Sequence, residues 1–400
     1  MNPAAYDPYS WSVQDDPYPV YRWLRDHAPV YRCEERDCVV LSRYADVVEA
    51  LRDPRFSNRN GVTLDPSTWG PQARRTSSFL AMDAPEHTQV RGLVASAFSP
   101  RRVSALEPRI RQLVRSRLSP LLDQDSFDFA RDFAAPLPME VICELTGVPP
   151  GDRDRVRQAA DLLTPRDDGA SDRDEAGAGA ARSLYRYYLD LVADLRRHPG
   201  GDLTSALTQA HGGGLRLDDG QITGIIFLLV TAGNDSTGKL LGNAWYQGWL
   251  HPDVRRAGLD GRAADWAAET LRYDSSSQMM ARTLTCDTDM HGVRIPGGAR
   301  VVLLPASANR DERVFPDPDR FDLDRGASQA ISFGHGPHYC LGAPLARLQA
   351  RIALEELGTV ITSYELDPEG IVRGHWPHIR GFTALTCRIT RRPVPPGRAA

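Results

Sequence analysis

The residues best suited to chemistry surround one cysteine near the carboxy-terminal end of the chain. Cys340 lies in a loop that contains Gly334, Gly336 and Gly342, directly before an expected helix. Glycines let a backbone turn tightly and approach a ligand without a Cβ in the way. A helix amino terminus lowers the pKa of a nearby thiol, and loop amides tune the sulfur further. Such a thiolate suits the axial position of a haem iron that activates oxygen, although an isolated cysteine is more often a buried structural residue.

Polar residues interrupt an otherwise apolar stretch, residues 218–250. The stretch contains no proline and is apolar nearly all round in its first half, so it is expected to form one long helix through the core. Asp235 and Ser236 follow Gly233 in its middle. Buried polar side chains are costly unless they have a task, and a glycine leaves room for a small molecule beside the helix. The alternative is a simple kink in the helix.

Two pairs of side chains have helical spacing. Glu269 and Arg272 are three residues apart, share a helix face and can form an ion pair. His87 and Arg91 are four residues apart and could grip one carboxylate. Taken alone, the first pattern is more often a solvated surface pair, and a helical histidine is more often an ordinary core or surface residue.

Composition excludes several classes of protein. With 41% hydrophobic residues in 400, the chain can bury a large core. Its net charge of −4 argues against a nucleic-acid partner, and its six scattered cysteines form no C-x-x-C pair, which argues against a zinc site or disulfide framework. Residues 1–9 do not form a signal peptide, and the longest apolar run, 225–230, is too short to span a membrane. The sequence therefore predicts a cytoplasmic protein.

The expected fold class is mainly α with a small β portion, the sheet being formed from both ends of the chain. Helices are expected over residues 43–52, 85–98, 103–122, 137–145, 152–163, 182–197, 218–250, 263–273 and 343–361. Strands are expected over 30–34 and 38–42, within 293–305, and after 364. Residues 54–84 are expected to form a long loop with one helical turn near Gln72, and loops of that length are often functional.

Residues 166–181, called the lid segment below, are the most loop-like part of the chain. They are rich in glycine and charge, and they separate two amphipathic helical patterns that need the same body to pack on. We therefore predict a mobile lid over a substrate channel, in preference to a domain linker. With little apolar surface to dock, the segment is expected to open at low free-energy cost.

The chain resembles the cytochrome P450 family, soluble bacterial type, over residues 16–390. Residues 333–342 fit that family's F-G-x-G-x-H-x-C-x-G loop at every fixed position, and residues 83–91 resemble its D-x-P-E-H-T-x-x-R. The resemblance implies haem b, iron protoporphyrin IX, with Cys340 as the metal ligand. The other cofactor-binding residues that it implies in the loop are Phe333, Gly334, His338 and Gly342. Of these, His338 would face a haem propionate, as would His87, Arg91 and Arg282 from other parts of the chain.

Two more segments match the family. Residues 232–237 resemble A-G-x-[DE]-T-[TS], which implies Asp235 as the acid and Ser236 as the hydroxyl of a catalytic proton relay. Most relatives have threonine where this chain has Ser236, so the hydroxyl is kept while the methyl that restricts χ1 is lost. Glu269 and Arg272 match E-x-x-R, which implies a buried structural brace with Arg320 as its partner.

What the resemblance implies is a P450 fold with a long central helix over the haem, and residues 1–400 as a single domain. The implied function is a haem-thiolate monooxygenase that inserts one oxygen atom of O₂ into a small, largely apolar organic substrate. Electrons would come from a ferredoxin and its reductase, since the chain has no G-x-G-x-x-G after a strand. Neither nucleic acid nor a membrane is expected as a partner. Two alternatives stay open: a haem-binding sensor or carrier, and peroxide-driven or coupling chemistry at the same haem.

The substrate cannot be inferred by analogy, because residues 274–280 lack the proline that relatives usually carry there. The pocket is predicted to be lined by Leu80, Val230, Gly233, Met279, Met280 and Phe382. The basic surface that would meet an acidic electron donor is predicted to use Arg101, Arg102, Arg347 and Arg351.

Overall fold

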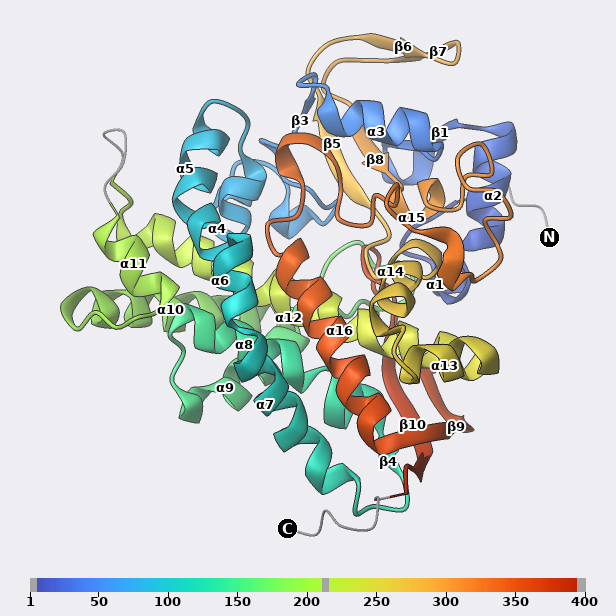
Figure 1. The fold of residues 1–400 in the computed structure, drawn as a ribbon. Helices are drawn as coiled ribbons and strands as arrows, with labels where there is room; N and C mark the ends of the chain where they lie inside the picture. The colour runs from blue at the N-terminus through green and yellow to red at the C-terminus, as the bar shows by residue number, and fades with distance from the viewer. Residues whose placement is uncertain (1–5, 211–215, 394–400) are drawn as a thin grey trace.

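The computed structural model describes residues 6–210 and 216–393 (Figure 1). Helices make up most of this part of the chain, and the strands form small sheets at its periphery, which confirms the expected fold class. None of the helices within these ranges is long and apolar enough to cross a membrane.

The central element is α12, Asp219–Leu250, which crosses the middle of the molecule (Figure 1). It begins at a capping box, in which the Asp218 carboxylate accepts from the Gln221 amide and the Gln221 side chain accepts from the Asp218 amide. No proline interrupts its 32 residues. It packs against α4 (Ala73–Ser77), α8 (Pro136–Thr146), α10 (Glu175–Arg197) and α14 (Ala263–Tyr273), and most of its apolar side chains are buried. The long core helix is confirmed.

The remaining helices are α1 Trp11–Asp15, α2 Tyr18–His27, α3 Tyr44–Arg52, α5 Glu86–Ala95, α6 Pro100–Ala105, α7 Glu107–Leu118, α9 Arg153–Asp161, α11 Leu203–Gln209, α13 Pro252–Leu259, α15 Pro305–Ala308 and α16 Ala343–Val360. Among them, α3, α5, α9 and α16 agree with expected ranges, whereas α1, α2, α11, α13 and α15 were not expected from the sequence. The helix expected over 103–122 is shorter, because a break at Leu106 separates α6 from α7, and Pro108 occupies the first turn of α7. The turn expected near Gln72 is α4.

The larger sheet has five strands in the order β1-β2-β8-β5-β3. The strands are β1 (Val30–Cys33), β2 (Cys38–Leu41), β3 (Phe56–Ser57), β5 (Met280–Leu284) and β8 (Arg300–Leu303). Only β2 and β8 pair in parallel, with Val39 opposite Val301. Strand β5 was missed in the sequence because it is short and carries a buried arginine, Arg282. The second sheet has the order β4-β10-β9, with β4 at Phe127–Asp128, β9 at Ile361–Arg373 and β10 at Phe382–Arg391. A third, two-stranded sheet pairs β6 (Thr288–Met290) with β7 (Val293–Ile295).

The lid segment is better anchored than its composition suggests. Helix α10 begins at Glu175 rather than 182, with Asp174 capping it through the Gly177 amide. Arg166 and Asp65 form a buried ion pair of 2.6 Å, and the Gly169 amide donates to the Tyr9 carbonyl. The expectation of little docking is therefore corrected: polar contacts hold the segment where apolar contacts are scarce.

Candidate functional site

The loop that carries Cys340 is shaped by backbone contacts. Gly334 and Gly336 have φ values of +73° and +70°, a region that favours glycine. A Cβ on Gly336 would lie 2.8 Å from the Leu51 carbonyl oxygen. The Cys340 amide donates to the Phe333 carbonyl at 2.8 Å, and α16 begins three residues after the cysteine. The turn, the close approach and the helix together fix the position of the sulfur.

The side chain of Cys340 is not closed off by the protein around it. Its side chain is accessible to solvent, yet it lies deep enough among protein atoms that burial raises its thiol pKa. The amides of Gly342 and Ala343, together with the charges of Arg91 and Arg347, act in the opposite direction. The loop amides thus lower this pKa as expected, but at this thiol burial outweighs them. Coordination to a metal ion deprotonates a thiol outright.

A cluster of basic side chains from three elements lies near this loop. His87 comes from α5, Arg282 from β5, and His338 from the loop itself. The rings of His87 and His338 have centroids 3.9 Å apart. Burial lowers the pKa of His338 to about 3, and the charges of His87, Arg282 and Arg91 lower it further. Burial also lowers the pKa of Arg282 to about 10 and that of His87, which the charge of Arg91 lowers as well.

The basic cluster fits the carboxylates of a haem. Nε2 of His87 and Nδ1 of His338 are buried and have no hydrogen-bond partner. Arg282 donates to the Ala281 carbonyl and the Met280 sulfur, and the charge of Asp83 acts on it. Buried donors of this kind need an acceptor, and two propionates beside an accessible thiol would supply it. His87, Arg91, Arg282, His338 and Cys340 thus meet in one place.

Helix α12 presents Ala232, Asp235 and Ser236 in sequence order along its middle. Ala232 is exposed although the helix is largely buried, so it borders an accessible space. The Ser236 hydroxyl donates to the Ala232 carbonyl at 3.0 Å, and one Asp235 carboxylate oxygen is buried without a partner. The other oxygen lies 3.8 Å from Nζ of Lys239. Ser236 therefore lies beside the exposed Ala232, whereas the Asp235 side chain is only 16% exposed.

One predicted pocket residue on α12 is corrected. Val230 is fully buried in the main core and has no accessible surface. Gly233 stays partly accessible, and a Cβ there would lie 3.2 Å from Cγ1 of Ile142, so this glycine also allows α8 to pack closely on α12.

Two more predicted pocket residues are also corrected. Met279 is buried and accepts from the Tyr6 hydroxyl, so it packs on the amino-terminal segment. Phe382 packs on Tyr246, with ring centroids 4.7 Å apart, and is buried. Met280 and Leu80 keep partly accessible side chains. Met279 precedes β5, which begins at Met280, and the two methionines pack in different apolar clusters.

The brace is confirmed, and its expected partner is corrected. Glu269 and Arg272 are buried, with Arg272 Nη2 2.7 Å from Glu269 Oε1 and Nε 2.9 Å from Oε2. The side chain of Arg320 is 71% exposed and lies near Asp322; only its carbonyl oxygen reaches Arg272. The arginine that meets Glu269 is Arg325, at 3.4 Å. The sequence signal that could have identified this partner is Arg325 itself, five residues after Arg320.

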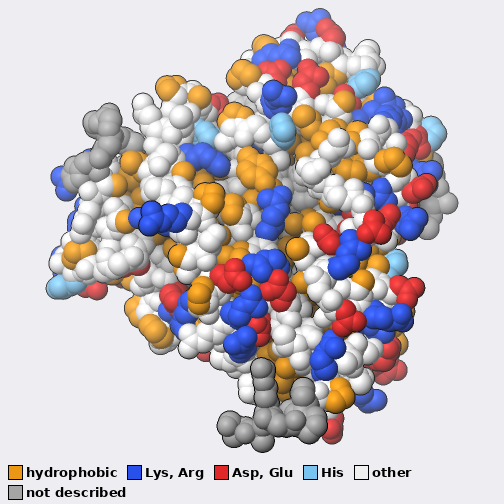
Figure 2. Space-filling model, in the orientation of Figure 1, with side chains coloured by type: hydrophobic (Ala, Val, Ile, Leu, Met, Phe, Trp, Pro, Cys, Tyr) orange, Lys and Arg blue, Asp and Glu red, His pale blue; other side chains and the backbone are white. Residues whose placement is uncertain are grey.

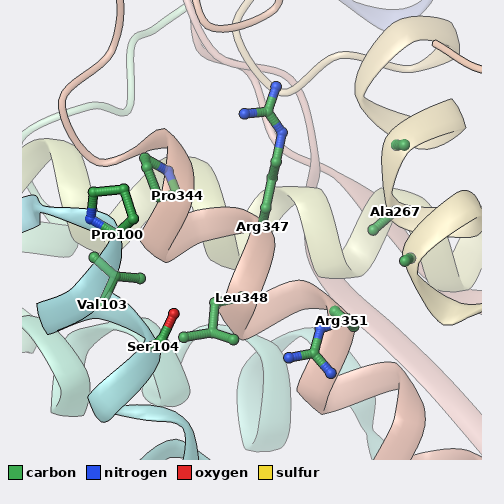
Figure 3. A pocket seen from close by; sticks show the side chains of 10 residues that line it. Pro100, Val103, Ser104, Ala267, Pro344, Arg347, Leu348 and Arg351 are labelled. Carbon is green, nitrogen blue, oxygen red and sulfur yellow. The ribbon is translucent and has the colours of Figure 1, made fainter. Parts of the chain in front are cut away.

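The face formed by α6, α14 and α16 carries a hollow of about 310 Å³ (Figure 3). Apolar side chains such as Val103, Ala267 and Leu348 line it, and Arg347 and Arg351 flank it. Arg347 lies 4.6 Å from the ring centre of Phe333 in the cysteine loop. Arg351 pairs with Glu107 at 2.8 Å, and basic and acidic side chains alternate over this region (Figure 2). Arg101 and Arg102 are also exposed.

Known proteins share this architecture. The family model "Cytochrome P450" matches residues 266–372. A Mycobacterium tuberculosis protein assigned as cytochrome P450 123 is 47% identical over 390 residues, which cover 96% of this chain and 97% of that protein. Vitamin D(3) 25-hydroxylase of Pseudonocardia autotrophica is 38% identical over 88% of each chain. The structure of CYP109Q5 from Chondromyces apiculatus superposes with a TM-score of 0.87 at 32% identity, covering 98% of this chain and 100% of that one. An accessible thiol, a basic cluster with two unpartnered histidine nitrogens and these similarities lead to one conclusion: the chain belongs to the cytochrome P450 family and is a haem-thiolate monooxygenase.

Proposed function

We propose that this P450 inserts one oxygen atom of O₂ into a small, largely apolar organic substrate, with electrons delivered by a ferredoxin and its reductase. The observation that carries the proposal is the accessible Cys340 thiol beside two buried histidine nitrogens that lack a hydrogen-bond partner. The haem, when bound, supplies the activation of dioxygen. Every other task falls to side chains of the chain itself.

In this proposal the cofactor is held from two sides. Cys340 ligates the iron, and the amides of Gly342 and Ala343 stabilise its charge. His87, Arg91, Arg282 and His338 bind the two propionates, which would satisfy the buried nitrogens of both histidines. Phe333 and Gly334 shape the loop around the sulfur, since Phe333 accepts from the Cys340 amide.

Asp235 and Ser236 are proposed to deliver protons. A carrier or sensor has no need of them, whereas oxygenation forms water and consumes protons. Ser236 now donates to the Ala232 carbonyl, so its hydroxyl must rotate about χ1 to reach a reacting group. Serine has three accessible staggered rotamers and can do so. The unpartnered oxygen of Asp235 can accept and pass on a proton.

The electron donor is proposed to dock over the 310 Å³ hollow. Arg347 lies between this surface and Phe333, so a docked donor would approach the cysteine loop. Exposed Arg101 and Arg102 would add positive charge for an acidic partner. Arg351 contributes less to this charge, because Glu107 and Glu355 neutralise it.

The substrate is proposed to be apolar and to enter beneath the lid segment. Leu80 and Met280 offer apolar accessible surface, and a relative of the chain is named for the hydroxylation of vitamin D(3), an apolar molecule. We further propose that residues 1–400 act as one domain, since α12 packs against elements from α4 to β10. All six cysteines are free thiols, as in the reducing cytoplasm that we propose as its location.

Two measurements test the proposed function. Reduced holoenzyme with carbon monoxide should show the strongly red-shifted Soret band of thiolate ligation. Substrate-dependent NADH consumption with ferredoxin and reductase should then yield a product that carries one atom from labelled O₂. Turnover with peroxide alone and none with the donor pair would favour the peroxide-driven alternative. Binding of apolar compounds without any turnover would favour a carrier.

A further inference from the structure

A small polar cavity lies between α12, the end of α9 and the start of β10. Its volume is about 20 Å³, and its polar lining residues are Asp161, Asn234, Asp235 and Lys239. One water molecule needs about 10–15 Å³ and two to four polar partners. The cavity therefore has room for one water and none for an organic substrate.

The groups around the cavity lack partners that a water would supply. Asn234 donates from Nδ2 to Asp161 Oδ1 at 3.4 Å, while its own Oδ1 is buried and unpartnered. Oδ2 of Asp235 is also buried and unpartnered. Two orphan acceptors beside a cavity of this size are the usual signature of a structural water.

Asp161 connects the cavity to bulk solvent. It is the last residue of α9, its side chain is 47% exposed, and Arg157 pairs with it at 3.1 Å. Asp235, on the inner side, is only 16% exposed. Burial raises the pKa of Asp161, the charge of Asp235 raises it further, and Arg157, Asn234 and Lys239 oppose this rise. A carboxyl group with a raised pKa takes up protons closer to neutral pH.

Lys239, the single lysine of the chain, closes the inner side of the cavity. Its Nζ lies 3.8 Å from Asp235 Oδ1, 3.2 Å from the Phe382 carbonyl oxygen and 3.9 Å from the ring centre of Trp376. Burial lowers the pKa of Lys239, while Asp235 and Asp161 raise it. These contacts fix the ammonium group, and the ammonium group in turn fixes one oxygen of Asp235.

We infer that Asp161 is the solvent-side entry of a proton path that crosses this cavity through one water to Asp235, and that Lys239 is the positioning residue for Asp235. The inference rests on the proposed relay, in which Asp235 supplies Ser236. A solvent proton binds the Asp161 carboxylate, passes through the water to Asp235, and leaves through Ser236. No electrons move along this path, and each group returns to its starting protonation state.

The entry is tested with Asp161→Asn and a matched control, Asp154→Asn. Asp154 lies on the same helix, contacts the same Arg157 at 3.9 Å and is 81% exposed, so its variant removes an equal charge away from the cavity. With the holoenzyme, ferredoxin, reductase and NADH, Asp161→Asn should lower product formation about tenfold, less than the loss of a direct acid because water can bypass it. Its solvent deuterium isotope effect should rise. The control should match wild type, and both variants should keep the carbon monoxide spectrum.

Lys239→Met tests the positioning role through the pH profile. The charge of Lys239 lowers the pKa of Asp161, so removing it should raise that pKa and move the acidic limb of kcat to higher pH. The other groups that act on the carboxyls of the path, Arg157, Asn234 and His378, are unchanged. A purely structural lysine would lower thermal stability and leave the limb in place, and that result would overturn the positioning role.

Asp235→Asn separates the inference from the proposed relay. If Asp235→Asn releases peroxide in place of product while Asp161→Asn behaves like Asp154→Asn, the entry at Asp161 is wrong and the relay stands. If Asp235→Asn couples as well as wild type, the relay itself is wrong, and the path through the cavity is wrong with it.

Discussion

The cysteine loop and the lid segment are held in place by different kinds of contact. Within residues 331–343, successive backbone hydrogen bonds link Gly334 to Ile331, Cys340 to Phe333 and Ala343 to Cys340. The lid segment depends on partners far along the chain, chiefly Asp65, which pairs with Arg166 and accepts from the Tyr9 hydroxyl. The thiol is thus fixed by several local bonds, whereas the lid segment is held by a few long-range polar contacts that can be removed singly.

The largest expected effect is at the cysteine. Cys340→His should abolish the red-shifted carbon monoxide band and monooxygenation, because imidazole lacks the electron donation of a thiolate. The basic cluster is untouched, so haem should still bind. Absorption spectra and haem content of the purified variant check this. A variant with the wild-type band would show that Cys340 is not the ligand.

Next in size is the brace behind the loop. Arg272→Ala leaves Glu269 buried without its main partner, and breaking such a pair costs about 3–5 kcal/mol of unfolding free energy. The control, Arg320→Ala, keeps the carbonyl that Arg272 uses, and its exposed side chain should contribute less than about 0.5 kcal/mol. Denaturant unfolding of both variants measures the difference. Equal losses would restore Arg320 as the partner.

A smaller effect is expected at the lid segment. Asp65→Asn removes the charge that Arg166 faces, although three carbonyls still accept from Arg166. We expect local opening to become easier by about 2 kcal/mol. Hydrogen exchange over residues 166–181 should quicken accordingly and slow again when a tight substrate binds. If neither the substitution nor the substrate changes the exchange rate of residues 166–181, the segment is not a lid.

Motifs of contiguous residues predicted the local structure of the cysteine loop and the pairing of Glu269 with Arg272. Residues 333–342 and the Glu269–Arg272 pair are positioned by turns and by helical spacing, which are local properties. The pocket wall could not be predicted in the same way. Val230 and Gly233 lie on a helix that is apolar on most sides, so its periodicity does not tell which face meets α8 and which stays accessible. The role of Lys239 could not be predicted either, because its partners Phe382 and Trp376 lie far from it in the sequence.

The smallest expected effect concerns Ser236, the hydroxyl residue of the proposed proton relay on α12. Its hydroxyl donates to the Ala232 carbonyl in the resting helix, and serine holds such a donor less firmly than threonine because it lacks the β-methyl. Ser236→Ala should therefore divert much of the electron flow to hydrogen peroxide while substrate affinity stays nearly unchanged. Ser236→Thr should keep or improve coupling if the added methyl fits beside Ala232. Product formed and peroxide released per NADH consumed, with the natural electron donors and a bound substrate, measure both variants. An alanine variant that couples as well as wild type would show that the substrate or an ordered water supplies this hydrogen bond. It would also show that α12 tolerates the loss of this single donor, whereas the cysteine loop does not tolerate the loss of Cys340.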